Sequence, residues 1–107
     1  MIKYYMLAIE QGCSISMNNI GLYYKSTEDY DNMLKYFKIS CDNKNTEAMN
    51  NLADYHLDKG EFGDMEYYLV LAVGCGDKIA CNKLIQYYKV NGRWKLVKRY
   101  IELYTFL

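Results

Sequence analysis

The sequence predicts an all-α fold, a right-handed superhelix of about three helical hairpins preceded by a half-unit, with about seven helices. First, the chain repeats itself: sixteen of the 75 residue pairs that lie 32 positions apart are identical, about three times the roughly one in sixteen expected by chance. Second, apolar residues recur at helical spacing within each period, and turn residues separate the runs. A hairpin of two short helices cannot bury its apolar faces alone, so successive hairpins must stack into a solenoid.

The repeat is visible as columns of like residues. We interpret residues 1–107 as one domain with units at about 14–44, 46–76 and 78–107, and with 1–12 as a half-unit. The columns hold Tyr4, Tyr36, Tyr68 and Tyr100; Met17, Met49 and Cys81; Asn18, Asn50 and Asn82; Ile20, Leu52 and Leu84; and Tyr23, Tyr55 and Tyr87.

The helices follow in order from this register. An opening helix is predicted at about 2–11; the first helix of each unit at about 14–25, 46–58 and 78–90; and the second at about 30–42, 63–74 and 94–105. Ser14, Thr46 and Asp77 are the expected caps of the first helices. Gly60 and Gly92 are expected to end two of the first helices in a left-handed residue, and Gly12 and Gly76 to close two of the second helices.

Side-chain size predicts how the helices pack. Gly21 and Ala53 would allow the two helices of a hairpin to approach closely. Large aromatic residues near the start of each second helix should fill the turn between the helices; these are Tyr30, Phe62 and Trp94.

Two segments carry a resemblance to a known family. Ala48-Met-Asn-Asn-Leu-Ala-Asp-Tyr-His, followed by Met65-Glu-Tyr-Tyr-Leu-Val-Leu-Ala-Val-Gly-Cys-Gly, resembles the Sel-one-like repeat, a relative of the tetratricopeptide repeat. Ser16-Met-Asn-Asn-Ile-Gly-Leu-Tyr-Tyr matches most closely, and the chain also looks like the Asn- and Tyr-rich repeat proteins of giant amoeba-infecting DNA viruses. The turn between the helices of a unit is shorter than is usual in Sel-one-like repeats. The resemblance implies an α-α superhelix with a groove for a peptide.

Composition argues against several partners. The formal net charge is zero and the pI is about 6.5, so a basic face for nucleic acid is not expected. The longest apolar run, Tyr67 to Val73, is far shorter than a membrane span. Because the N-terminal segment lacks a small-residue cleavage site before Glu10, we expect an intracellular, cytoplasmic protein, in the host cytoplasm if it is viral.

Residues with catalytic or metal-binding chemistry are scarce. The only histidine, His56, falls in the column of Tyr24 and Tyr88, which indicates a packed imidazole in place of a phenol ring. One histidine without a Cys-x-x-Cys spacing gives little support to a zinc site. Glu61 and Asp64 are expected to be solvated charges at a helix start. We therefore predict a non-enzymatic protein with no cofactor, in which the four cysteines are reduced.

The favoured function is a protein-interaction scaffold that binds a protein or peptide on the concave face. Asn18, Asn50 and Asn82 would form a ladder there, and an asparagine amide offers both a donor and an acceptor to an extended peptide backbone. The alternative is that these asparagines cap or bridge helices. Further candidate contacts lie later in the same helices: Asp54 and Gln86 four residues on, then Lys25 and Lys89.

A second hypothesis is self-assembly, or a piece of a longer repeat array. The last predicted helix carries apolar residues around much of its circumference, and so does the opening one. Exposed apolar faces of this kind usually mark an interface, so homo-association through the terminal helices is expected.

Overall fold

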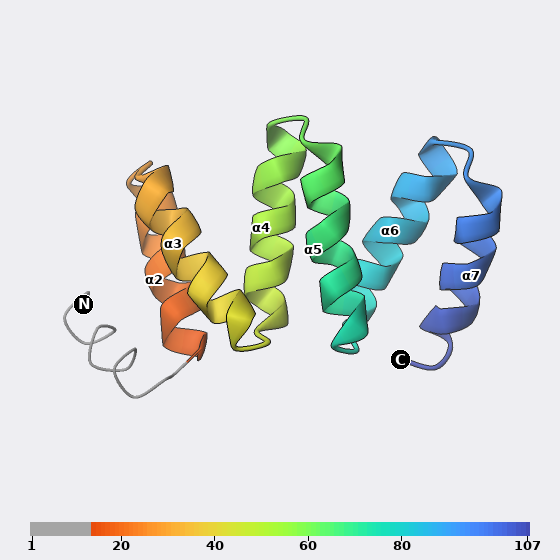
Figure 1. The fold of residues 1–107 in the computed structure, drawn as a ribbon, viewed down its shortest axis with the longest axis horizontal. Coiled ribbons are helices and arrows are strands. Elements are labelled where there is room, and N and C mark those ends of the chain that lie inside the picture. The colour runs from red at the N-terminus through yellow and green to blue at the C-terminus, as the bar shows by residue number, and fades with distance from the viewer. Residues whose placement is uncertain (1–13) are drawn as a thin grey trace. The chain divides into compact units, whose positions relative to one another are not determined.

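The computed structural model describes residues 14–107, and this part of the chain contains six helices and no strand (Figure 1). Every boundary lies within one residue of its prediction, so the all-α class is confirmed. The predicted helix at about 2–11 and Gly12 lie outside the described residues. The helices are α2 (Ser14–Ser26), α3 (Tyr30–Asp42), α4 (Thr46–Asp58), α5 (Phe62–Gly74), α6 (Lys78–Val90) and α7 (Trp94–Tyr104).

Consecutive helices pack on one another. The chain divides into two compact units, one that ends at Leu52 and one that comprises Ala53–Leu107. Within the first unit α2 packs against α3, and within the second α5 packs against α6 and α6 against α7. The predicted hairpin arrangement is thus confirmed, whereas the handedness of a superhelix stays a prediction. None of the described helices has the length and apolar character that crossing a membrane requires.

The turns between helices repeat with the period of the sequence. Gly60 and Gly92 have φ of 74° and 69°, as predicted, and Glu28, the residue of the same column in the first hairpin, keeps φ at 61°. A left-handed residue with a side chain costs roughly 1–2 kcal/mol, so the tertiary structure imposes this turn even without glycine. The same backbone hydrogen bond closes all three turns: Asp29 N to Tyr24 O at 2.9 Å, Glu61 N to His56 O at 2.8 Å and Arg93 N to Tyr88 O at 3.0 Å.

One predicted helix cap is wrong and another is confirmed. Asp77 caps α6, because its carboxylate accepts a hydrogen bond from Ala80 N at 3.2 Å. At α4 the corresponding acceptor is Asn45 Oδ1, 3.0 Å from Ala48 N, instead of Thr46. The capping side chain must lie one residue before the first helical residue to reach the amide three positions on. Asn45 stands in the same column as Asp77, so the repeat register places the cap of α4 at Asn45.

Packing follows the repeated columns. Ile20, Leu52 and Leu84, which form one column, are each fully buried. Gly21 contacts the core closely, since a Cβ at this position would lie 2.4 Å from Cδ1 of the buried Phe37. The predicted close approach of α2 and α3 is therefore confirmed. The aromatic residues at the starts of the second helices, Tyr30, Phe62 and Trp94, are 44%, 49% and 63% exposed, so their role as fillers of the turns stays a prediction.

Candidate functional site

The second unit contains a hollow of about 550 Å³ between α4, α5 and α6. Its lining comes from the C-terminal half of α4, from one face of α5 and from α6 from Asn82 onward. Its lining consists of Ala53, Asp54 and Leu57 from α4; Phe62, Met65 and Leu69 from α5; and Asn82, Lys83, Gln86, Tyr87, Val90 and the following Asn91 from α6.

The hollow is mainly apolar. Met65 and Leu69 are buried, whereas Leu57, Phe62 and Val90 remain 45%, 49% and 86% exposed. Phe62 stacks on Tyr87 with ring centroids 6.2 Å apart, which links α5 to α6 beside the hollow. Contiguous exposed apolar side chains around a concave surface usually mark a place where another molecule binds.

The polar residues of the hollow carry little net charge. Lys83 Nζ lies 3.3 Å from Asp54 Oδ1, so the cation of α6 and the anion of α4 neutralise one another. The remaining polar groups are the amides of Asn82, Gln86 and Asn91 and the phenol of Tyr87. Asn82 and Gln86 are exposed, and each amide offers a donor and an acceptor. The hollow therefore suits a ligand that combines apolar groups with neutral hydrogen-bonding groups.

The predicted contact residues divide between different surroundings. Asp54, Asn82 and Gln86 line the hollow, but Asn18 is buried in the first unit. The carbonyl of Asn18 accepts from Asn51 Nδ2 at 3.0 Å, and its amide donates to Glu47 Oε2 at 3.4 Å. Asn18 thus bridges α2 and α4, which is the structural alternative to a peptide contact.

The other predicted contacts lie elsewhere. Asn50 donates its amide to the carbonyl of Thr46, one turn earlier in α4, at 2.9 Å. Lys25 and Lys89 are exposed near the ends of α2 and α6, and neither lines the hollow. Whether Asn18, Asn50 and Asn82 take part in binding stays a prediction.

The apolar residues of the hollow were not predicted from the sequence. Leu57 stands in the column of Lys25 and Lys89, and Val90 in that of Ser26 and Asp58. Each is the only apolar residue at an otherwise polar position of the repeat. An apolar residue at a position that is polar in the other repeats was the sequence signal that could have indicated the hollow.

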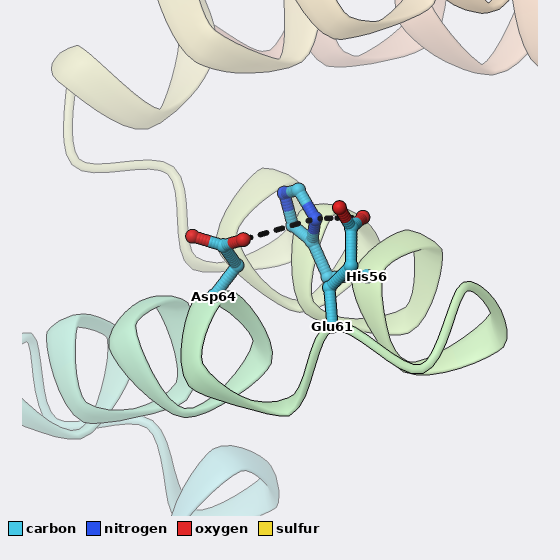
Figure 2. Close-up of side chains that lie close together, drawn as sticks. All are labelled: His56, Glu61 and Asp64. Carbon is cyan, nitrogen blue, oxygen red and sulfur yellow. Dashed lines mark hydrogen bonds and ion pairs between the residues drawn. The ribbon is translucent and has the colours of Figure 1, made fainter.

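A second cluster of side chains lies at the turn between α4 and α5 (Figure 2). His56 Nδ1 is 3.1 Å from Glu61 Oε1 and 4.0 Å from Asp64 Oδ2. The imidazole is stacked on Tyr68, with ring centroids 5.7 Å apart and an interplanar angle of 4°. The prediction of a packed imidazole in a tyrosine column is confirmed, whereas its two carboxylate neighbours were not predicted.

Two potential nucleophiles are held in their protonated forms. Burial raises the pKa of the Cys81 thiol, which donates to Tyr100 O at 3.3 Å. Burial also raises the pKa of the Tyr88 phenol, and the 2.5 Å hydrogen bond that it donates to Glu66 raises the pKa further. Cys75 and Cys81 are free thiols, whereas Cys13 lies outside the described residues.

No family model matches this chain, and a search of curated proteins finds no relative. The resemblance to Sel-one-like repeats therefore stays a prediction from the residues quoted above.

Proposed function

We propose that the protein is a non-enzymatic interaction module whose second unit binds a short, mainly apolar segment of a partner protein in the hollow between α4, α5 and α6. The observation that carries this proposal is the combination of exposed apolar residues with neutral amides around one concave surface. Leu57, Phe62 and Val90 provide apolar area, and Asn82 and Gln86 provide hydrogen bonds to a peptide backbone.

Charge favours a protein segment over an anionic ligand. Nucleic acid and phosphorylated peptides require unpaired lysines or arginines at the contact. Among the residues that the structure describes, Lys83 is the one cation that lines the hollow, and it is paired with Asp54. A volume of about 550 Å³ lies within the range of roughly 300–1,000 Å³ that is common for binding clefts.

A selection from a library of short displayed peptides, followed by affinity measurements on the intact protein, tests this proposal. Val90→Lys places a charge at the hollow while replacing a side chain that is 86% exposed, so the fold should be retained. We expect the selected peptides to contain apolar residues and to bind Val90→Lys at least about tenfold more weakly, a loss of about 1.4 kcal/mol.

Ile79→Lys is the matched control. Ile79 is also an aliphatic residue of α6, 65% exposed, but it does not line the hollow. Peptide affinity should be unchanged in this variant. Peptides that bind wild type and Val90→Lys equally well would exclude the hollow as the binding site.

Self-association is the second candidate function, and the surface of the C-terminal helix favours it. Ile101 and Tyr104 of α7 are 44% and 41% exposed, and Phe106 just beyond it is 85% exposed. Large exposed apolar groups on one element are a common feature of interfaces between copies of a chain.

Light scattering over a concentration series measures this association directly. We expect the mass to rise above the 12.6 kDa of one chain at high micromolar concentration, and Ile101→Glu to return it to the monomer value without loss of helix content. A wild-type protein that stays monomeric throughout would contradict the second function and leave the first intact.

A further inference from the structure

We propose that His56, Glu61 and Asp64 form a binding site for a divalent first-row transition-metal ion, of which Zn²⁺ is the representative. The three ligand atoms, one imidazole nitrogen and two carboxylate oxygens, lie within 4.8 Å of one another at the turn between α4 and α5 (Figure 2). The site is separate from the hollow, since none of the three residues lines it.

The turn brings the ligands together. Gly60 adopts a left-handed conformation, and Glu61 N donates to His56 O at 2.8 Å, which directs the chain back toward the end of α4. Asp64 then follows Glu61 by three residues, on the same side of the first turn of α5. Figure 2 shows the Nδ1 atom of the imidazole between the carboxylates of Glu61 and Asp64, with a contact to each.

The imidazole is fixed before any ion binds. Its side chain is 15% exposed, it stacks on Tyr68, and the ring of Tyr55 meets it edge-on at 5.3 Å. The carboxylates of Glu61 and Asp64 are 47% and 63% exposed. An ion would therefore be held by a rigid nitrogen and two adjustable oxygens, with its remaining positions open to water.

Comparison with the other two hairpins shows that packing alone does not require these residues. Tyr24 stacks on Tyr36 with centroids 5.7 Å apart, and Tyr88 packs on Tyr100 at 5.6 Å, just as His56 packs on Tyr68. A phenol thus fills this place in both neighbouring repeats. The column of Glu61 holds Asp29 and Arg93, and that of Asp64 holds Asn32 and Leu96. Only the middle hairpin combines an imidazole with two carboxylates.

The carboxylate of Glu61 is also not used as a helix cap. Asp29, its counterpart before α3, accepts from the backbone amide of Asn32 at 3.3 Å. Glu61 occupies the equivalent N-cap position of α5 but makes no side-chain capping bond, and its carboxylate lies beside His56 instead. The first hairpin thus uses the acid to stabilise the helix end, whereas the middle hairpin directs it to the imidazole.

The donor set identifies the class of ion. Imidazole nitrogen with carboxylate oxygen suits Zn²⁺, Co²⁺, Ni²⁺ and Cu²⁺, whereas Mg²⁺ and Ca²⁺ prefer oxygen ligands alone. Ligand distances of about 2.0–2.2 Å require ligand atoms roughly 3–4 Å apart, so the side chains need to move only slightly. Binding at Nδ1 needs its lone pair. The imidazole that binds the ion through Nδ1 therefore carries its proton on Nε2. A ring protonated on both nitrogens releases the Nδ1 proton to solvent on binding, whereas a neutral ring with its proton on Nδ1 exchanges it through solvent for one on Nε2, with no net release.

The test is titration of the intact, chelator-treated protein with Zn²⁺ by calorimetry and with Co²⁺ by visible absorption, under reducing conditions. We expect one ion per chain, a higher melting temperature with Zn²⁺, and no displacement by millimolar Mg²⁺. His56→Tyr installs the residue of the neighbouring repeats and keeps the stack on Tyr68. It should fold and bind Zn²⁺ at least about tenfold more weakly, as should Glu61→Gln and Asp64→Asn.

Asp58→Asn removes an exposed acid in the last turn of α4 that is not part of the cluster, so its affinity for Zn²⁺ should equal that of wild type. The proposal is overturned if the wild-type protein binds neither ion at concentrations up to about 1 mM, since its binding free energy would then be weaker than about 4 kcal/mol. It is equally overturned if His56→Tyr binds as well as wild type, or if the Co²⁺ spectrum contains the intense near-ultraviolet band of thiolate ligation. None of these results depends on peptide binding in the hollow.

Discussion

Leu52→Ala is expected to lower the free energy of unfolding by about 2–5 kcal/mol, the usual cost of truncating a fully buried leucine. Leu52 has no exposed surface, and its side chain is among the largest that are fully buried. Leu103→Ala should cost about 1 kcal/mol or less, because Leu103 is 37% exposed and loses less apolar contact. Urea unfolding followed by far-UV circular dichroism measures both values.

Leu71→Ala is the control for position along the chain. Leu71 shares the column of Leu103 and is also 37% exposed, although it lies in an inner helix. If burial sets the cost, Leu71→Ala should resemble Leu103→Ala. A loss for Leu52→Ala no larger than for these two variants would contradict the burial pattern described here.

The helices were predictable because the repeat samples each position three times. A single capping residue or glycine is weak evidence, but Gly60 and Gly92 in one column place the turn in all three hairpins. The backbone then obeys the column even at Glu28, where the residue type alone argues against a left-handed turn. The fold class and the helix boundaries are predicted from what the residues of a column have in common, so one atypical residue does not change the prediction.

The candidate sites were less predictable because they depend on departures from the repeat. Asn18, Asn50 and Asn82 share a column, yet one is buried, one bonds its own helix and one lines the hollow. Leu57 and Val90 add apolar area to the hollow at positions where the other repeats hold polar residues. An average over repeats hides these differences.

The cluster around His56 was difficult to predict from the sequence for a further reason. Glu61 follows His56 by five residues, and Asp64 follows Glu61 by three. On one continuous helix these two spacings would not bring all three side chains to the same point. They meet because the chain reverses at Gly60. The proximity of the histidine and the two acids was not predictable from the sequence, because it depends on the three-dimensional path of the turn.

Gly21→Ala is expected to destabilise the protein by about 1–2 kcal/mol, although alanine favours helices by about 1 kcal/mol over glycine. The new Cβ would lie 2.4 Å from Cδ1 and 2.5 Å from Cε1 of Phe37, far inside van der Waals contact. Phe37 is fully buried, so its ring cannot move aside without displacing its neighbours. Overpacking of this kind costs typically 1–3 kcal/mol and outweighs the gain in helix propensity.

Gly63→Ala is the matched control, because Gly63 is also helical and a Cβ there would contact nothing within 4 Å. It should leave stability unchanged or raise it by up to about 1 kcal/mol. The repeat also supplies a rescue: the columns of Gly21 and Phe37 hold Ala53 and Leu69 in the next hairpin. Adding Phe37→Leu to Gly21→Ala recreates that pair, so the double variant should lose less stability than the two single losses combined. Two results of urea unfolding would contradict this. If the losses of the two single variants simply add in the double variant, or if Gly21→Ala is as stable as Gly63→Ala, the contact between α2 and α3 is looser than 2.4 Å implies.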